Sequence, residues 1–306
     1  MPIPKGLFVL TGSQNFQLLD KVNQSLAGRT AILKLLPFSM GEIKSAVRKM
    51  SLDQLLLKGF YPRIYDEKLE PHHALSFYFE TYVERDVRSL LHVKDLSSFQ
   101  KFVRLCAGRV GQLLNLSSLG NEAGISHTAA REWLSLLEAS YIVFLLPPYH
   151  KNYNKRVTKA PKLYFYDVGL ASYLLGIENV KQMQRDPLRG NLFENLIVIE
   201  FLKNRYEKAE NSNLSFFRDS NKNEVDLIAP LQKALWAVEV KSSQTVAPDF
   251  FKGLNYFEAL HREGEIKKAL VYGGDQNQVR SAGHVVGWKG LSTFLNKTKA
   301  KKSSSK

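Results

Sequence analysis

Apolar and polar positions alternate with changing periods along the chain, and these periods divide it into segments. Two short apolar runs near the start, LFVLTGS and TAILKLLPF, are typical of β-strands. The residues after them repeat apolar positions with a helical period, and the second half alternates helical and strand-like stretches. This pattern predicts an α/β protein with five segments: strands over 1–40, helices over 41–115, a helix-turn-helix with two strands over 116–176, an α/β domain over 188–290, and a basic disordered tail over 291–306.

Residues 116–139 have the spacing of a helix-turn-helix. A short helix is predicted to end at Ala123, Gly124 to make the turn, and Ser126 to cap a second helix over 127–139. Two strand-like runs follow, YIVFLLPPY and KLYFYDVG, with the basic run HKNYNKRVTKAPK between them, which favours a winged helix that binds DNA. The predicted DNA contacts are His127, Thr128 and Arg131 toward the groove, and Lys151, Lys155 and Arg156 toward the backbone. The alternative is a winged helix that only packs between domains.

The stretch NEVDLIAPLQKALWAVEVKSS, residues 223–243, carries the candidate chemistry. It reads as a β-hairpin with Asp226 on the first strand, and since strands alternate faces, Glu239 and Lys241 share one face of the second. Carboxylate oxygens are ligands for Mg²⁺, and a neighbouring lysine can orient an activated water. Asp226 and Glu239 are therefore the predicted metal ligands, and Glu194, from the helix-like run GNLFENLIVIEFLKN, completes a predicted catalytic set with Asp226, Glu239 and Lys241.

These residues resemble a known signature. Glu194, Asp226 and the triplet Glu239-Val240-Lys241 look like the PD-(D/E)xK nuclease motif. The motifs YVERDV, LYFYDVGLA, GNLFEN, EVDLI and VEVKSS resemble, in order, a family of bacterial and archaeal AAA-type ATP-binding proteins. In that family a winged helix and a restriction-endonuclease-like domain of unknown function follow the ATPase. The resemblance implies a remnant of the ATPase edge, a helical lid, a winged helix and a restriction-endonuclease-like domain with a mixed sheet.

The start of the chain fits the same resemblance in part. LFVLTGSQ looks like the sensor strand of an AAA ATPase, with Ser13 or Gln14 at the position that senses the γ-phosphate, and SLAGR presents Arg29 to nucleotide. The 306 residues contain no G-x-x-x-x-G-K-[ST] motif, the loop that cradles phosphates. We therefore interpret the chain as the C-terminal part of such a protein, with Ser13, Gln14 and Arg29 as relics, and expect it neither to bind ATP well nor to hydrolyse it by itself.

Charge and composition limit the classes of partner that the protein is expected to bind. The net charge of +14 favours polyanions, although it is also consistent with solubility alone. The single cysteine, Cys106, excludes a disulfide framework, and no apolar run reaches the ~18 residues of a membrane span. We expect a cytoplasmic protein that binds DNA or another nucleic acid, with an ATPase partner or a second copy of itself and no membrane.

Two main functions are consistent with these patterns. The first is a nucleic-acid-associated module with a nuclease-like domain. The alternative is an active Mg²⁺-dependent DNA endonuclease of the PD-(D/E)xK type. A third interpretation is a chain that folds poorly at its start, because strand 7–12 lacks neighbours.

Overall fold

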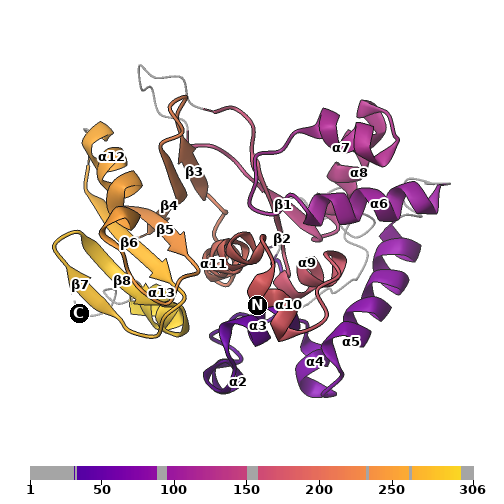
Figure 1. Ribbon diagram of the computed structural model, residues 1–306, viewed down its shortest axis with the longest axis horizontal. Coiled ribbons are helices and arrows are strands. Elements are labelled where there is room, and N and C mark those ends of the chain that lie inside the picture. The colour runs from indigo at the N-terminus through magenta and orange to yellow at the C-terminus, as the bar shows by residue number, and fades with distance from the viewer. Residues whose placement is uncertain are drawn as a thin grey trace, which may run out of the picture. The chain divides into compact units, whose positions relative to one another are not determined.

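Helices and strands follow one another along the chain largely as the apolar pattern predicts (Figure 1). The structure is a computed structural model that describes residues 31, 33–87, 95–149, 158–231, 234–261 and 264–297, without the side chains of residues 84–87 and 297. The chain divides into two compact units, Met1–Lys34 and Leu35–Lys306, and every element described below belongs to the second. The predicted nucleotide-sensing residues Ser13, Gln14 and Arg29 lie outside the described residues.

Short helices with clear start signals form the first part of this unit. Ser51 makes a reciprocal capping box with Gln54, and Pro62 and Pro71 occupy the first turns of their helices, where a missing N–H costs no hydrogen bond. Asp95 caps the last and longest of these helices. The helices are α2 (Lys44–Lys49), α3 (Leu52–Lys58), α4 (Pro62–Asp66), α5 (Pro71–Tyr78), the π-helix η1 (Phe79–Val87) and α6 (Leu96–Ala107).

The predicted helix-turn-helix has the expected boundaries. Helix α7 (Leu116–Ala123) ends at Gly124, whose φ of 77° suits glycine, and Ser126 caps α8 (His127–Ala139). Strands β1 (Val143–Leu146) and β2 (Lys162–Phe165) then pair antiparallel, and residues 110–114 pair with the other edge of β2. This order of elements is that of a winged helix, although its identity as one stays a prediction.

A mixed six-stranded sheet forms the C-terminal half, as expected for the α/β domain. Its strand order is β3-β4-β5-β6-β8-β7, in which β5, β6 and β8 run parallel and the other neighbours antiparallel. The strands are β3 (Ser215–Arg218), β4 (Glu224–Leu231), β5 (Ala234–Lys241), β6 (Ile266–Tyr272), β7 (Gln278–Arg280) and β8 (Gly283–Gly287). The remaining helices of this half are η2 (Pro248–Phe251), α12 (Lys252–Leu260), η3 (Trp288–Gly290) and α13 (Leu291–Lys297).

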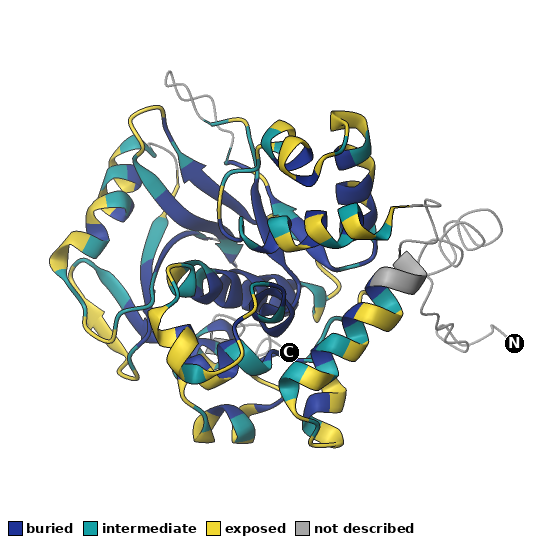
Figure 2. Cartoon of the chain, turned by 45° about the vertical axis from the view of Figure 1, so that its right-hand side comes forward, coloured by how far each residue is buried: buried dark blue, intermediate teal, exposed yellow. Residues whose placement is uncertain are grey.

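Three helices connect the two halves, namely α9 (Val168–Leu174), α10 (Val180–Arg185) and α11 (Arg189–Tyr206). Helix α11 is buried along most of its length and lies between the strands β1 and β2 and the large sheet (Figures 1 and 2). Helix α12 packs against β4 and β5, where Leu254 and Phe257 join an apolar cluster with Ile228 and Ala237. The acidic residues described below therefore sit where α11 meets β2, β4 and β5.

Two expectations about the chain's ends need correction. The second apolar run, TAILKLLPF, is no strand over its described residues 33–38, because no described strand pairs with it, and Leu33 and Leu35 are exposed. The predicted disordered tail begins too early at residue 291. Residues Leu291–Lys297 form α13, because Leu291 and Leu295 are buried against the rest of the unit, and residues 298–306 lie outside the described residues.

Asp167 connects the start of helix α9 with the turn that follows helix α3. Its Oδ1 accepts a hydrogen bond from the Leu170 amide at 2.9 Å and so caps α9, and its Oδ2 accepts one from the Phe60 amide at 2.7 Å. The carboxylate is almost completely buried, and a Cβ at Gly59, where φ is 64°, would lie 2.3 Å from its Oδ1. A helix cap thus also fixes the turn after α3.

Replacement of Asp167 tests this double role. Asp167→Ala leaves two buried amides without an acceptor, and we expect the free energy of unfolding to fall by about 2–4 kcal/mol in urea titrations. The matched control is Asp95→Ala, which removes a cap of the same kind at the exposed start of α6, where water replaces the lost acceptor. We expect a clearly smaller loss there, and equal losses would contradict the role of Asp167 in joining the two elements.

Candidate acidic site

The four residues of the predicted catalytic set converge where helix α11 meets β4 and β5. Asp226 Oδ2 accepts a hydrogen bond from the Val240 amide at 2.8 Å, which ties β4 to β5 at this point. Lys241 Nζ lies 2.5 Å from Glu239 Oε1, so these two side chains share a face as predicted. Glu194 projects from the second turn of α11, and its charge and that of Asp226 influence each other. The hairpin and the helix therefore bring the predicted residues together, whereas their chemical roles stay predictions.

A fifth residue, Lys162 of β2, reaches into the same place. Its Nζ lies 2.9 Å from Glu194 Oε1, 2.5 Å from Glu224 Oε1 and 3.9 Å from Asp226 Oδ1. Its side chain is only 3% exposed, and its ammonium lies 5.4 Å from the centre of the Phe216 ring. Since carboxylates from α11 and from β4 of the large sheet lie around it, Lys162 is the central cation of the site.

Two further residues extend the site beyond the predicted set. The Tyr164 hydroxyl donates a hydrogen bond of 2.5 Å to Glu194 Oε1, and Arg218 Nη1 lies 3.0 Å from Glu224 Oε2. The sequence holds a signal for these residues. Lys162 and Tyr164 are alternate positions of one strand, as are Glu224 and Asp226, so each pair shares a face. Sequence reasoning used only the second strand of the hairpin in this way and missed Lys162, Tyr164, Glu224 and Arg218.

Burial and neighbouring charge shift the ionisation of the acids. Burial raises the pKa of Glu239 to about 8 and that of Glu194 to about 7, and the nearby charge of Asp226 acts in the same direction. Lys241 partly offsets the rise at Glu239, and Lys162 does so at Glu194. Burial alone would lower the pKa of Lys162, but the carboxylates of Glu194, Asp226 and Glu224 raise it, so the ammonium stays charged. The site is thus a buried cluster of mutually dependent charges.

The fit of this cluster to a divalent cation can be judged from its donors. Glu239 Oε2 is buried and has no hydrogen-bond partner among the described residues, which leaves one oxygen available. The Oε1 atoms of Glu194 and Glu224, however, already contact Lys162, and Glu224 Oε2 contacts Arg218. In the described parts of the chain, no group of three or more His, Cys, Asp or Glu side chains is arranged to hold a metal ion. Lys162 therefore occupies part of the donor set, and a metal site at Asp226 and Glu239 stays a prediction.

Three of the predicted DNA contacts lie on α8 and are not part of this buried cluster. His127, Thr128 and Arg131 are exposed on α8, whereas Ala130, Leu134 and Leu137 on its other side are buried. The basic residues Lys151, Lys155 and Arg156 lie outside the described residues.

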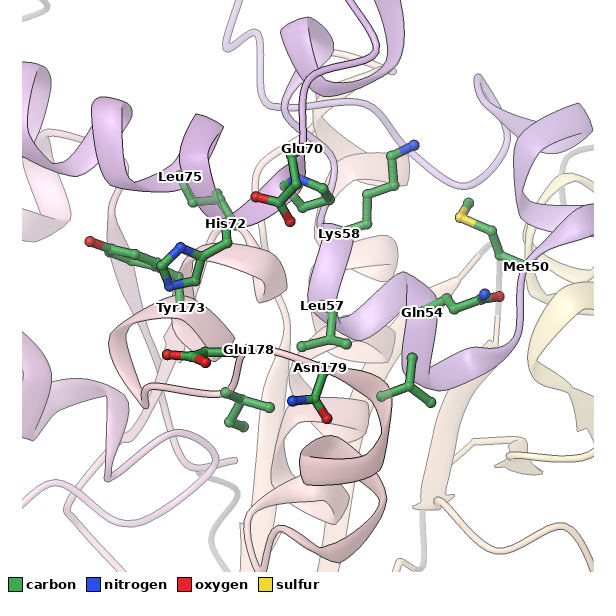
Figure 3. Close-up of a pocket in the computed structure, with 13 residues that line it drawn as sticks. Met50, Gln54, Leu57, Lys58, Glu70, His72, Leu75, Tyr173, Glu178 and Asn179 are labelled. Atoms are coloured by element: carbon green, nitrogen blue, oxygen red, sulfur yellow. The ribbon is translucent and has the colours of Figure 1, made fainter.

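A cavity of about 370 Å³ lies between α3, α5 and the connection from α9 to α10 (Figure 3). Its walls combine apolar side chains with the polar side chains of Glu70, His72 and Asn179. Glu70 and Asn179 cap α5 and α10, and His72 packs against the ring of Tyr173 with centroids 5.1 Å apart. These polar groups have local structural roles, so we assign no ligand to the cavity.

Three sequence families match successive parts of the chain. Residues 3–44 match the family described as AAA domain, residues 49–181 a domain of unknown function (DUF8612), and residues 189–291 another domain of unknown function (DUF4143). These matches are consistent with an AAA-like ATPase-family protein and support the resemblance at that level. The winged helix and the PD-(D/E)xK nuclease domain remain predictions.

Proteins of three bacteria are similar to the chain. Uncharacterized proteins of Mycobacterium tuberculosis and Mycobacterium bovis are each 26% identical over 276 residues, which cover 90% of this chain and 60% of the relative. An uncharacterized protein of Haemophilus influenzae is 26% identical over 213 residues, covering 65% of this chain and 51% of the relative. The chain thus spans about three fifths of the length of the mycobacterial relatives.

No solved structure is significantly similar to the chain. Among the described helices, none is long and apolar enough to cross a membrane.

The raised pKa of Glu239 predicts a pH dependence of stability. Folded Glu239 keeps its proton up to about pH 8, whereas in the unfolded chain the same carboxyl releases it near its ordinary pKa of 4.5. The folded state therefore binds more protons in this window, and the free energy of unfolding falls as pH rises from about 5 to 8. We expect Glu239→Gln to flatten this fall in urea titrations at pH 5.5, 7 and 8.5. Glu132→Gln, the same change on the exposed side of α8, serves as the matched control. If the free energy of unfolding varies with pH in the same way in the parent and both variants, the raised pKa of Glu239 is wrong.

Proposed function

We propose that this chain is the nucleic-acid-associated part of an AAA-like ATPase-family protein, and that it binds DNA through α8 and the basic run that follows β1. The observation that carries the proposal is the exposed face of α8, which presents His127, Thr128 and Arg131. These are the positions of a second helix, after a tight turn, from which helix-turn-helix proteins contact base edges. The chain alone, without a phosphate-binding loop in its 306 residues, is not expected to hydrolyse ATP.

The packing of α8 supports this orientation. Ala130, Leu134 and Leu137 are buried, and Trp133 packs edge-on against Phe99 of α6 with ring centroids 5.4 Å apart. Within the described residues, the opposite side of the first turns of α8 is exposed. The side chain of Arg131 is exposed, and a guanidinium at such a position can contact a phosphate or a base edge.

The described residues on either side of positions 150–157 are hydrogen-bonded to strand β3. The Tyr149 amide donates to the Phe216 carbonyl at 2.7 Å, and the Thr158 amide donates to the Arg218 carbonyl at 3.1 Å. Lys151, Lys155 and Arg156 thus belong to a segment whose flanks are fixed on the edge of β3.

A second candidate function is metal-dependent DNA cleavage. The convergence of Glu194, Asp226, Glu239 and Lys241 favours it. The contacts of Lys162 with the same acids weigh against it, because they take the oxygens that a metal would need. We therefore rank binding before cleavage. An ATPase or a second copy of the chain is the proposed protein partner.

Arg131 provides the first test of DNA binding. Arg131→Ala is expected to weaken binding to a fluorescent duplex by roughly tenfold in anisotropy titrations, as for loss of a groove contact of about 1–3 kcal/mol. Lys181→Ala makes the same charge change on an exposed turn of α10 and is expected to leave the affinity nearly unchanged. Equal effects of the two variants, or no binding by the parent chain, would count against the proposal.

The basic run provides the second test. Lys155→Ala/Arg156→Ala removes two proposed phosphate contacts, so the slope of log affinity against log salt is expected to become shallower by roughly 2. The measurement repeats the anisotropy titration at four salt concentrations with the parent, the double variant and Lys181→Ala. An unchanged slope in the double variant would place the phosphate contacts elsewhere.

A further inference from the structure

Lys162 occupies the position at which the acids of the site converge. Oxygens of Glu194 and Glu224 lie within 2.9 Å of its Nζ and an oxygen of Asp226 within 3.9 Å, although these acids come from a helix and a strand far from it in sequence. We propose that Lys162 is a built-in cation that takes the place of a divalent metal ion and closes the acidic site to Mg²⁺ and Mn²⁺.

The backbone fixes this lysine firmly. Strand β2 pairs with β1 on one edge and with residues 110–114 on the other. The Leu114 amide donates to the Pro161 carbonyl at 2.8 Å, and the Leu163 amide donates to the Gln112 carbonyl at 3.1 Å, so hydrogen bonds hold both neighbours of Lys162. The ammonium can move away from the acids only if the buried side chain of Lys162 changes its conformation. Such a change would leave the carboxylates of Glu194 and Glu224 without the lysine that they share.

The charges of the site are nearly balanced without a metal. Four described acids, Glu194, Glu224, Asp226 and Glu239, face three cations, Lys162, Arg218 and Lys241. The acids therefore exceed the cations by one. A divalent ion added to this set gives an excess of positive charge in a buried place, which is costly.

Mg²⁺ and Mn²⁺ also need several oxygen ligands, most of them at about 2.0–2.2 Å. Glu194 Oε1 already accepts from both Lys162 and Tyr164, and Glu224 is shared between Lys162 and Arg218. Removal of the ammonium frees these oxygens, while Glu194 and Glu224 themselves remain in place. The same acids that exclude a metal in this chain therefore become a metal site once Lys162 is neutral.

Isothermal titration of MnCl₂ into the purified full chain tests this inference. The parent is expected to show no saturable binding at millimolar Mn²⁺, and Lys162→Met to bind one ion at least tenfold more tightly than the parent. Thermal melts give a second readout: Mn²⁺ is expected to raise the melting temperature of Lys162→Met by several degrees and to leave that of the parent unchanged.

Two controls separate the site from general effects. Lys159→Met makes the same change on an exposed residue three positions earlier and is expected to behave as the parent. Lys162→Met/Glu194→Gln/Asp226→Asn also lacks the lysine but has fewer acids, and it is expected to lose the metal binding. If Lys162→Met folds only poorly, refolding with and without Mn²⁺ shows whether the ion restores it.

Two results would overturn the inference. One is saturable Mn²⁺ binding by the parent that Asp226→Asn abolishes, since the site would then accept a metal with Lys162 present. The other is a folded Lys162→Met variant that binds Mn²⁺ no better than the parent. Neither result depends on DNA, so the outcome is independent of the proposed nucleic-acid binding.

Discussion

The burial of helix α11 is the constraint on which the rest of the structure depends. A helix covered along most of its length needs a partner for each polar group that it carries inward. Asn195 exchanges two hydrogen bonds with the backbone of Phe165, and Glu200 accepts from the Met40 amide. Lys203 donates to the Phe38 carbonyl, and Arg205 donates to the Pro230 carbonyl. These partners lie on residues 38–40, on β2 and on β4, so α11 links the N-terminal part of this unit, β2 and the sheet.

The acidic site follows from this arrangement. Glu194 stands one position before Asn195, so the hydrogen bonds that align β2 with α11 also bring Lys162 and Tyr164 to Glu194. On the other side, Arg189 pairs with Asp53 and donates to the Ser242 carbonyl, next to the end of β5. The site's geometry is therefore set by the same contacts that hold the fold together, which is why its acids remain close despite their mutual repulsion.

Sequence reasoning succeeded where a local rule decides the structure. Gly124 and Ser126 mark a turn and a cap, and the alternation of Glu239 and Lys241 fixes a shared face, so the helix-turn-helix boundaries and the hairpin were predictable. Prediction from the sequence failed where contacts between residues far apart in the chain determine the structure. The role of Lys162 depends on acids at positions 194, 224 and 226, and α13 forms because Leu291 and Leu295 find an apolar surface supplied by the rest of the unit. The run TAILKLLPF lacks a neighbouring described strand, which no local pattern reveals.

The residues of the ion cluster are divided between two of the matched families. Lys162 belongs to the match over residues 49–181, whereas Glu194, Glu224 and Asp226 belong to the match over 189–291. Loss of the lysine or of the acids alone would leave buried charge of one sign without its counterion. The two matched segments are therefore electrostatically dependent on each other at this site.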